Sequence, residues 1–367
     1  MKLTAPLQLV LTAAQHNTLV QTMARANEAC DYISQVAWDN QTFAQFKLHK
    51  LVYHVAKERF GLSAQMVVRC ISKVTDAYKI DKETQRTFRA AGAIAYDERI
   101  LTYNLKADTV SLWTLDGRLK NIPFRCGKRQ RALLQTQQGE SDLCLVRGSF
   151  YLNAVCNVEE PEPGDIGGVL GVDLGIVKIA TTSDGETFCG KQVETVRQRQ
   201  QALRSALQAK GTKSAKRHLK KLSGKQARFQ KHENHVISKQ LVAVAKGTNR
   251  AIGLEDLSGI NKRVGKRLRK TQRAKHTNWS FHQLRLYITY KSAVAGVPLV
   301  VVDPRYTSQR CHVCGHTERA NRRSQESFVC QDCGHEANTD VNAARNISYL
   351  GAMHVNRPIV SLSRATA

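Results

Sequence analysis

The hydrophobic and polar positions of the first 165 residues change their period along the chain. A short apolar run at 7–11 predicts a strand, and Thr12 is placed to cap a helix that follows it. Apolar residues then recur every three or four positions along about 13–90, which predicts helices. From about 94 to 158 the period is two, in short runs separated by turns. The region 1–165 is therefore expected to form a small antiparallel sheet or barrel that carries a helical insert.

A different pattern follows a linker rich in proline and glycine at 161–168. It contains three short strands, two long polar helices, a strand, a helix and a last strand. The strands are expected at 169–173, 176–182, 187–189, 251–255 and 297–303, and the single helix near 279–294. Three antiparallel strands followed by alternating helices and strands is the order of an RNase H-like domain. The predicted fold class is therefore α/β plus β.

Three acidic residues have local sequences that suit metal ligands: Asp173 in Gly-Val-Asp-Leu-Gly, Glu255 in Gly-Leu-Glu-Asp-Leu, and Asp340 in Asn-Thr-Asp-Val-Asn. In a strand of period two, Glu255 shares a face with Gly253, which leaves room for a metal and a phosphate, whereas Asp256 points away. Taken singly, each acid has a simpler explanation, because a lone Asp at a strand end is usually a turn residue and Asp340 could cap the following helix. Gathered carboxylates hold Mg²⁺, and their joint placement predicts nucleic-acid cleavage.

Four cysteines form two Cys-x₂-Cys pairs separated by fifteen residues, a spacing typical of a four-thiolate zinc site. Gly315 and Gly334 follow the pairs and permit tight knuckles. Two disulfides or a redox-active pair are the alternatives, and neither explains the paired glycines. With four sulfur ligands the zinc would have no open position and would be structural. The ligands would be Cys311, Cys314, Cys330 and Cys333, and the nearby His312, His316 and His335 are expected at the surface.

The charge of the chain narrows the choice of partner. Among its 367 residues, 56 Lys and Arg outnumber 30 Asp and Glu, a formal net charge of +26 that favours nucleic acid over an anionic membrane surface. Thirteen Lys or Arg lie between Lys191 and Lys231, and eight between Lys262 and Lys275. Such runs are usually solvated faces or tails, but these flank the predicted acidic strands and are expected to line a channel for phosphate backbones.

The length of the apolar stretches and the other cysteines indicate the cellular compartment. No stretch approaches the roughly 18 consecutive apolar residues of a membrane-spanning helix. Six cysteines outside the zinc pattern are scattered among apolar neighbours, which favours a reducing compartment over a secreted disulfide protein. We therefore expect a cytoplasmic protein.

Taken together, these residues resemble TnpB, the OrfB-type protein of insertion sequences, whose nuclease half is similar to the compact type V CRISPR effectors. The matching segments cover about half the chain in order. They are Gly-Val-Asp-Leu-Gly-Ile-Val (171–177), Asn-His-Val-Ile-Ser-Lys-Gln-Leu-Val (234–242), Gly-Leu-Glu-Asp-Leu (253–257), Thr-Ser-Gln-Arg-Cys-His-Val-Cys-Gly (307–315) and Asp-Val-Asn-Ala-Ala-Arg-Asn-Ile (340–347). One departure is Ala-Asn-Thr before Asp340, where the family commonly has an acid and a basic residue.

The resemblance implies a domain arrangement. Residues 1–165 would be a β-barrel wedge domain whose helical recognition insert occupies about 13–90. A split RuvC nuclease domain would comprise 166–307 and 334–350, with the zinc ribbon inserted at 308–333. A C-terminal tail at 351–367 would follow.

The resemblance also implies an RNA-guided, Mg²⁺-dependent DNA endonuclease, in which a transposon-derived guide RNA pairs with double-stranded target DNA beside a short motif. Asp173 would bridge two catalytic Mg²⁺ ions, with Glu255 and Asp340 each completing one, and one Zn²⁺ would be structural. Arg310 would contact the scissile strand or the guide duplex, or form a surface salt bridge. The resemblance also implies a prokaryotic cytoplasmic protein associated with the nucleoid. A monomer is favoured, with no membrane partner. The alternatives are a nuclease-silent RNA-guided repressor, a transposase that joins DNA ends without a guide, and a compact type V CRISPR effector.

Overall fold

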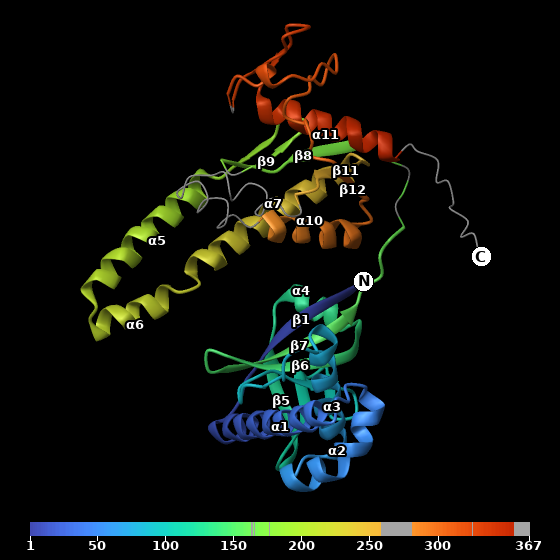
Figure 1. The fold of residues 1–367 in the computed structure, drawn as a ribbon, viewed down its shortest axis with the longest axis vertical. Coiled ribbons are helices and arrows are strands. Elements are labelled where there is room, and N and C mark those ends of the chain that lie inside the picture. Colours follow the sequence, from blue (N-terminus) through green and yellow to red (C-terminus); the bar gives the residue numbers. More distant parts are fainter. Residues whose placement is uncertain (163, 165, 176, 258–280, 325, 356–367) are drawn as a thin grey trace, which may run out of the picture. The chain divides into compact units, whose positions relative to one another are not determined.

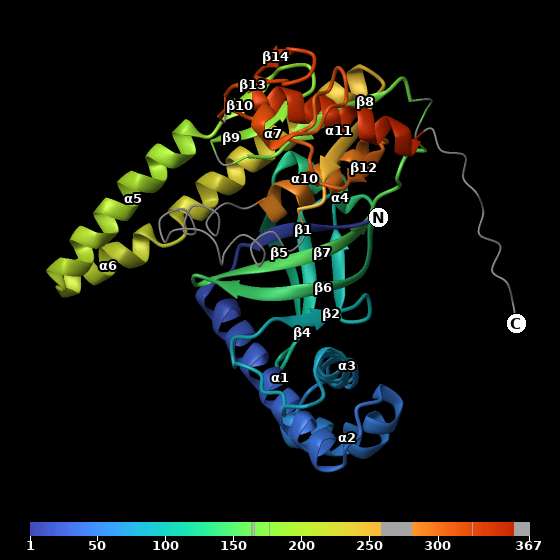
Figure 2. The same cartoon turned by 45° about the horizontal axis from the view of Figure 1, so that its top comes forward.

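The chain divides into two compact units, Met1–Glu159 and Glu160–Ala367 (Figure 1, Figure 2). The computed structural model describes residues 1–162, 164, 166–175, 177–257, 281–324 and 326–355. The division lies just before the proline- and glycine-rich linker.

The N-terminal unit is built on a seven-stranded antiparallel sheet in the order β2-β6-β7-β1-β5-β4-β3. The sheet curls until its ends approach, because Tyr103 Oη on β3 donates to Ser141 Oγ on β6 at 2.8 Å. The predicted barrel is therefore confirmed, as a nearly closed one. The elements are β1 (Lys2–Leu9), β2 (Ile94–Tyr96), β3 (Leu101–Asn104), β4 (Thr109–Thr114), β5 (Gly117–Arg125), α4 (Lys128–Leu134), β6 (Gln137–Val146) and β7 (Ser149–Asn157).

Three helices lie between β1 and β2, namely α1 (Ala13–Asp39), α2 (Gln45–Phe60) and α3 (Ala64–Ile80). Helix α1 begins at the predicted cap. Thr12 Oγ1 accepts from Gln15 N at 3.3 Å, and Gln15 Oε1 accepts from Thr12 N at 3.0 Å, which satisfies two otherwise unpaired donors. These helices fall within the range expected for the insert.

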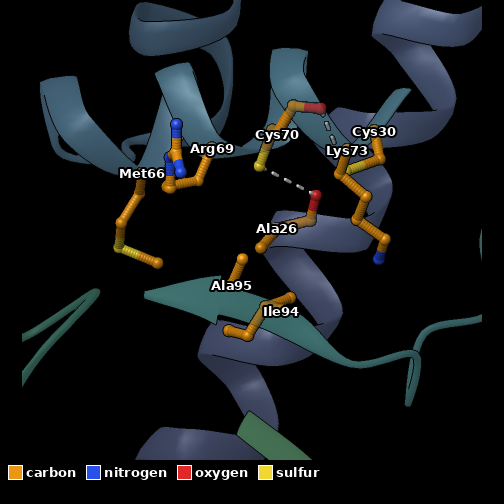
Figure 3. Close-up of a pocket in the computed structure, with 8 residues that line it drawn as sticks. All are labelled: Ala26, Cys30, Met66, Arg69, Cys70, Lys73, Ile94 and Ala95. Atoms are coloured by element: carbon orange, nitrogen blue, oxygen red, sulfur yellow. Dashed lines mark hydrogen bonds between the residues drawn. The ribbon is translucent and has the colours of Figure 1, made fainter. Parts of the chain in front are cut away.

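Figure 3 shows a small pocket where α1 and α3 meet β2. Two thiols, Cys30 and Cys70, lie in it, and Cys70 Sγ donates to Ala26 O at 3.5 Å. The hydrogen bond between the two cysteines, followed by burial, raises the pKa of Cys70. The buried thiols act here as apolar packing groups of the helical layer.

The C-terminal unit is built on a five-stranded sheet in the order β10-β9-β8-β11-β12. Strands β8 (Val169–Asp173), β9 (Lys178–Thr182) and β10 (Thr187–Cys189) are antiparallel, whereas β11 (Ala251–Glu255) and β12 (Leu299–Val302) run parallel to β8. The strands follow one another along the chain as predicted. Ile176, where the second strand was expected to begin, lies outside the described residues.

Between β10 and β11 the structure has three helices where the sequence predicts two. They are α5 (Lys191–Lys210), α6 (Lys213–Leu222) and α7 (Lys225–Gly247). Gly211 (φ 63°) and Gly224 (φ 78°) are left-handed and interrupt the helical run, and Thr212 Oγ1 caps α6 by accepting from Ala215 N at 3.1 Å. The prediction of two helices is wrong because these two breaks were overlooked. The second basic run, 262–275, lies outside the described residues.

The two faces of the C-terminal sheet are covered by different helices (Figure 1). Helices α7 and α10 (Phe281–Ala295) pack against one face, where residues such as Leu170 and Leu254 are buried. Helix α11 (Thr339–Val355) covers the other. A Cβ at Gly171 would lie 2.0 Å from Ala344 O, so only glycine allows α11 to approach β8 this closely. Gly253 has the same role, since a Cβ there would meet Ile347 Cγ2 at 3.2 Å. The sequence predicts that Gly253 leaves room beside Glu255 for a metal and a phosphate. In the structure, α11 fills that space instead.

The predicted ribbon lies between β12 and α11 and contains the short elements η1 (Arg319–Asn321), β13 (Phe328–Val329) and β14 (Glu336–Ala337). Helix α11 continues to Val355, so the first five residues of the expected tail are helical, and 356–367 lie outside the described residues. No helix in the described ranges is long and apolar enough to cross a membrane.

Candidate functional site

The three predicted acids come from three elements that meet at one end of the C-terminal sheet. Asp173 ends β8, and Glu255 ends the neighbouring parallel strand β11. Each lies two positions after a glycine that contacts α11, Gly171 or Gly253, and therefore faces the same helix. Asp340 lies in the first turn of that helix. The structure thus brings together carboxylates that are as much as 167 residues apart in sequence (340 minus 173).

The electrostatics show that the three acids share one environment. Burial, and then the charges of Glu255 and Asp340, raise the pKa of Asp173 to about 8, while Arg322 acts in the opposite direction. Burial also raises the pKa of Glu255, against a hydrogen bond from Thr307. The raised pKa values of Asp173 and Glu255 mean that their ionised forms are disfavoured in this site. A bound cation would stabilise these ionised forms.

Among the described residues, Thr307 and Lys178 contact these acids through their side chains. Thr307 Oγ1 donates to Glu255 Oε1 at 2.5 Å. Lys178 Nζ lies 3.3 Å from Asp340 Oδ2 and donates to Asn338 Oδ1 at 3.1 Å. Asp340 Oδ2 is buried and, within the described ranges, has an ion pair but no hydrogen-bond partner. One carboxylate oxygen is therefore incompletely satisfied at the centre of the site.

The alternative role for Asp340, as a helix cap, is not the one observed. Asn338 Oδ1 caps α11 by accepting from Asp340 N at 3.1 Å and Val341 N at 3.4 Å. Asn338 belongs to the segment that departs from the family pattern, and its side chain joins the cap of α11 to Lys178. The carboxylate of Asp340 is left for another partner.

The neighbouring acid Asp256 faces the opposite side of the sheet, as strand alternation predicts. Arg285 on α10 donates from Nη1 to Asp256 Oδ1 at 2.9 Å. Glu255 and Asp256 thus form a natural pair for comparison, one facing α11 and the other facing α10.

The four cysteines form a cluster whose sulfur atoms all lie within 4.8 Å of one another. Two Sγ–Sγ distances are 3.8 Å, for Cys311 and Cys333, and 3.5 Å, for Cys314 and Cys330. A tetrahedral zinc with Zn–S bonds of about 2.3 Å places its sulfurs about 3.8 Å apart. Gly315 N donates to Cys311 O, and Gly334 N to Cys330 O, which closes both knuckles. The cluster fits a metal ion such as zinc.

The residues around the knuckles make more contacts with the rest of the unit than the sequence predicted. His312 and His335 are half-buried and stack edge-to-face with ring centroids 4.6 Å apart, so their expected surface location is wrong. His312 N and Nδ1 lie 3.1 and 3.0 Å from Asn342 Oδ1 on α11. The guanidinium of Arg310 lies over the ring of Tyr349, 5.4 Å from its centroid. These contacts attach the ribbon to α11.

Sequence reasoning missed Lys178, Thr307, Asn342 and Asn346. No periodic signal distinguishes Lys178 or Thr307, since their partners are remote in sequence. The two asparagines could have been noticed, because they recur four residues apart on a helix whose neighbouring positions are apolar. A buried amide at helical spacing indicates a specific partner.

Two family models match the chain. Residues 153–264 match OrfB_IS605, described as "Probable transposase", and residues 281–347 match "Cas12f1-like, TNB domain". Between them these segments contain the three acids and the four cysteines. The resemblance to TnpB is confirmed.

The chain is also similar in sequence to individual curated proteins. Over 221 residues the chain is 31% identical to the CRISPR-associated endodeoxyribonuclease Cas12f1 of Sulfoacidibacillus thermotolerans, covering 55% of this chain and 50% of that protein. Over 222 residues it is 31% identical to the putative RNA-guided DNA endonuclease InsQ of Escherichia coli K12, covering 56% and 54%. The chain spans about half the length of these relatives.

Among solved structures, a Cas12f1 in complex with sgRNA and target DNA matches with a TM-score of 0.63 and 14% identity. The match covers 92% of this chain and 83% of that one. At this identity the likeness concerns the fold, and it includes both units.

Proposed function

We propose that this chain is an RNA-guided, Mg²⁺-dependent DNA endonuclease of an insertion-sequence transposon, which hydrolyses phosphodiester bonds through one RuvC-type site. The observation that carries the proposal is the convergence of Asp173, Glu255 and Asp340 at one end of the sheet, where burial and the other two acids raise the pKa of Asp173 to about 8. The names of the relatives, a Cas12f1 endodeoxyribonuclease and a putative RNA-guided endonuclease, support the same activity.

The chemistry of the acidic site fits a hard divalent cation. Its donors are carboxylate oxygens, the ligands that Mg²⁺ prefers. Asp340 Oδ2 is buried without a hydrogen bond in the described part of the chain, and a cation would satisfy it. We expect Asp173, Glu255 and Asp340 to hold two such ions. When bound, Mg²⁺ supplies an activated water and stabilises charge on the attacking and leaving oxygens.

The surrounding side chains prepare the acids for that role. Asp173 must release its proton to act as a ligand, and the positive charge of Arg322 favours its ionised form. Thr307 fixes one oxygen of Glu255 by its hydrogen bond. Hydrogen-bond partners of this kind orient the groups that bind the metal. Lys178 acts differently, because its ammonium group lies 3.3 Å from Asp340 Oδ2 and competes with a cation for that oxygen.

The remaining parts of the chain suit guided recognition of nucleic acid. Helix α6 exposes Lys216, Arg217, Lys220 and Lys221, and it belongs to the basic run between β10 and β11. In a guided nuclease, base pairing supplies sequence specificity and positive charge holds the backbones. We infer that the N-terminal barrel is the wedge domain, that α1–α3 form the recognition insert, and that 308–333 bind one structural Zn²⁺.

The test is cleavage of a plasmid target by the purified ribonucleoprotein with Mg²⁺, comparing Glu255→Gln with Asp256→Asn. The two positions are adjacent but face opposite sides of the sheet, and Asp256 is paired with Arg285. Glu255→Gln should abolish cleavage and Asp256→Asn should retain most of it. Equal activity of wild type and Glu255→Gln would exclude the acidic site as the nuclease centre. Target binding without any cleavage by wild type would favour the nuclease-silent repressor.

Sequencing of co-purified RNA tests the guided part of the proposal. Expression with the transposon end should yield one bound RNA of defined sequence, and omission of that end should remove it. DNA joining in the absence of RNA would favour the unguided transposase. A bound RNA that derives from a repeat array would favour the CRISPR effector.

A further inference from the structure

Two buried asparagines on α11 have no role in the metal chemistry described above. Asn342 and Asn346 are both 0% exposed and lie one turn apart on the helix that begins beside Asp340. Their neighbours Ala343, Ala344 and Ile347 are the apolar residues by which α11 packs on the sheet. Because burial of an amide is costly unless it is hydrogen-bonded, the partners of these side chains determine what they do.

Within the described residues, their side-chain hydrogen-bond partners lie on one short segment, 307–312, which leads from the end of β12 into the first cysteine knuckle. Asn346 Nδ2 donates to Thr307 O at 2.9 Å and to Arg310 O at 2.6 Å. Asn342 Nδ2 donates to Arg310 O at 2.8 Å, and Asn342 Oδ1 accepts from His312 N at 3.1 Å. The two amides therefore fasten this segment to α11 along its length.

The fastened segment connects both metal sites. At one end Thr307 donates its hydroxyl to Glu255, and the Thr307 side chain and backbone are 4% exposed. At the other end Cys311 is one of the four clustered thiols and is 0% exposed. Only three residues separate Thr307 from Cys311, and the carbonyl that both asparagines bind, that of Arg310, immediately precedes Cys311. A displacement of the knuckle therefore moves the Arg310 carbonyl that both asparagines bind, and Asn346, which also binds Thr307 O, passes the displacement to the hydroxyl on Glu255.

We propose that Asn342 and Asn346 are positioning residues that make the divalent-cation affinity of the acidic site depend on zinc in the ribbon. The inference rests on the proposed function, because it assumes that Glu255 binds the cation. With zinc bound, the knuckle is folded and the asparagines hold Thr307 against Glu255. Without zinc, the four-thiolate loop loses the metal on which its fold depends, and Thr307 no longer fixes the carboxylate. Loss of such an outer partner typically weakens metal affinity about 10- to 100-fold.

The experiment is a titration of the full chain with Mn²⁺, read as free Mn²⁺ by electron paramagnetic resonance, with zinc content measured on the same samples. Cys330→Ser should weaken Mn²⁺ affinity at least about tenfold. Asn346→Leu, which keeps the shape of the side chain and adds no charge, should weaken it similarly while retaining zinc. The double variant should be little weaker than either single variant, since both changes remove one coupling. Fully multiplicative effects, or loss of zinc from Asn346→Leu, would overturn the positioning role.

Two further variants keep the test independent of the stability of Asn346→Leu. Thr307→Val removes only the hydroxyl on Glu255 and should weaken Mn²⁺ affinity without changing zinc content, whereas Thr307→Ser should restore it. The matched control is Asn27→Leu, a buried asparagine of α1 whose Nδ2 donates to Met23 O and Gly92 O in the other unit. It should lower the melting temperature and leave Mn²⁺ affinity within twofold.

The outcomes separate this inference from the proposed function. If Asp173→Asn does not change Mn²⁺ binding, the acidic site is not a cation site and both ideas fail. If Asp173→Asn abolishes Mn²⁺ binding but the affinity of wild type is the same with and without zinc, only the coupling fails.

Discussion

The four-cysteine cluster and the three-acid cluster differ in how the chain assembles them. The cysteines lie within 23 residues, 311 to 333, and their spacing alone specifies two knuckles that face each other. The acids come from two strand ends and a helix start, and they meet only after the sheet order β9-β8-β11 is established and α11 has packed across it. One site is encoded by local spacing and the other by topology.

The difference extends to energetics. The knuckles are closed by their own backbone hydrogen bonds, and their sulfur atoms lie at distances that fit a tetrahedral zinc ion. In the acidic cluster, burial and mutual repulsion raise the pKa of Asp173 to about 8, so these side chains oppose folding when they are charged. Residues that destabilise the fold in this way are typical of functional sites. The two clusters should therefore respond in opposite directions when a ligand is removed by mutation.

The largest expected effect is at the cysteines. Cys330→Ser should lose zinc and, with it, the fold of the ribbon, because metal binding at a four-thiolate site is coupled to local folding and is worth about 10 kcal/mol or more. Cleavage should be lost as well. Zinc content by mass spectrometry and hydrogen exchange of residues 308–333 provide the measurements.

The control for this experiment is Cys189→Ser, which changes an exposed cysteine outside the cluster and should alter neither property. Full cleavage by a zinc-free Cys330→Ser protein would show that the ribbon is dispensable and would remove the comparison between the two clusters.

The next effect has the opposite sign. Asp173→Asn should abolish cleavage and yet stabilise the metal-free protein at pH 8. The pKa of Asp173 is raised from 3.8 to about 8, so the folded state keeps a proton that the unfolded state releases between these values. Wild-type stability should fall as the pH rises through that window, and the variant should not share this loss. We expect a higher melting temperature at pH 8 in EDTA, by on the order of 5 °C, and no difference near pH 4.

A second measurement checks the cause. Mg²⁺ should raise the melting temperature of wild type by binding the folded state and should have little effect on Asp173→Asn. If the variant were less stable than wild type at pH 8 without metal, repulsion among the acids would not be the dominant interaction at this site.

The contrast also explains what the sequence could predict. Spacing identified all four cysteines, and period-two alternation correctly separated Glu255 from Asp256, because both rules act over a few residues. No single acid could be predicted as a metal ligand from its own neighbours. The prediction depended on finding all three acids at positions that suit one site. Lys178 and Thr307 could not be predicted as site residues, because only the fold brings them to their partners, Asp340 and Glu255.

The helical boundaries show the same limit. The sequence predicts the succession of strands along the C-terminal unit, but two left-handed glycines, Gly211 and Gly224, divide a mostly polar stretch into three helices. The buried apolar residues of this stretch gather mainly in the second half of α7, from Ile237 to Ala245, so the breaks before them depend on single residues. Likewise, Gly253 beside Glu255 was interpreted as space for a ligand, although it allows α11 to approach the sheet.

A smaller effect is expected at Lys178, which connects the acidic cluster to Asn338. Lys178→Met removes a positive charge 3.3 Å from Asp340 Oδ2 and should strengthen Mn²⁺ binding by about 3- to 10-fold, because a cation at this site no longer competes with the ammonium group. Lys178→Arg keeps the charge and should behave as wild type. Weaker binding by Lys178→Met would mean that the lysine acts mainly to hold Asp340 in place.

The smallest effect concerns the salt dependence of nucleic-acid binding and lies outside both clusters. Lys216 and Lys220 are exposed, lie one turn apart on α6, and belong to neither metal site. If both contact phosphates, replacing them with glutamine should reduce the slope of log affinity against log salt by about 1.4 to 1.8, since each contact contributes about 0.7 for single strands and 0.9 for duplex. Replacing both with arginine should preserve the slope. Because zinc content and Mn²⁺ affinity should stay unchanged in the glutamine variant, a loss of either would show that α6 supports the metal sites and does not act only on the phosphate backbone.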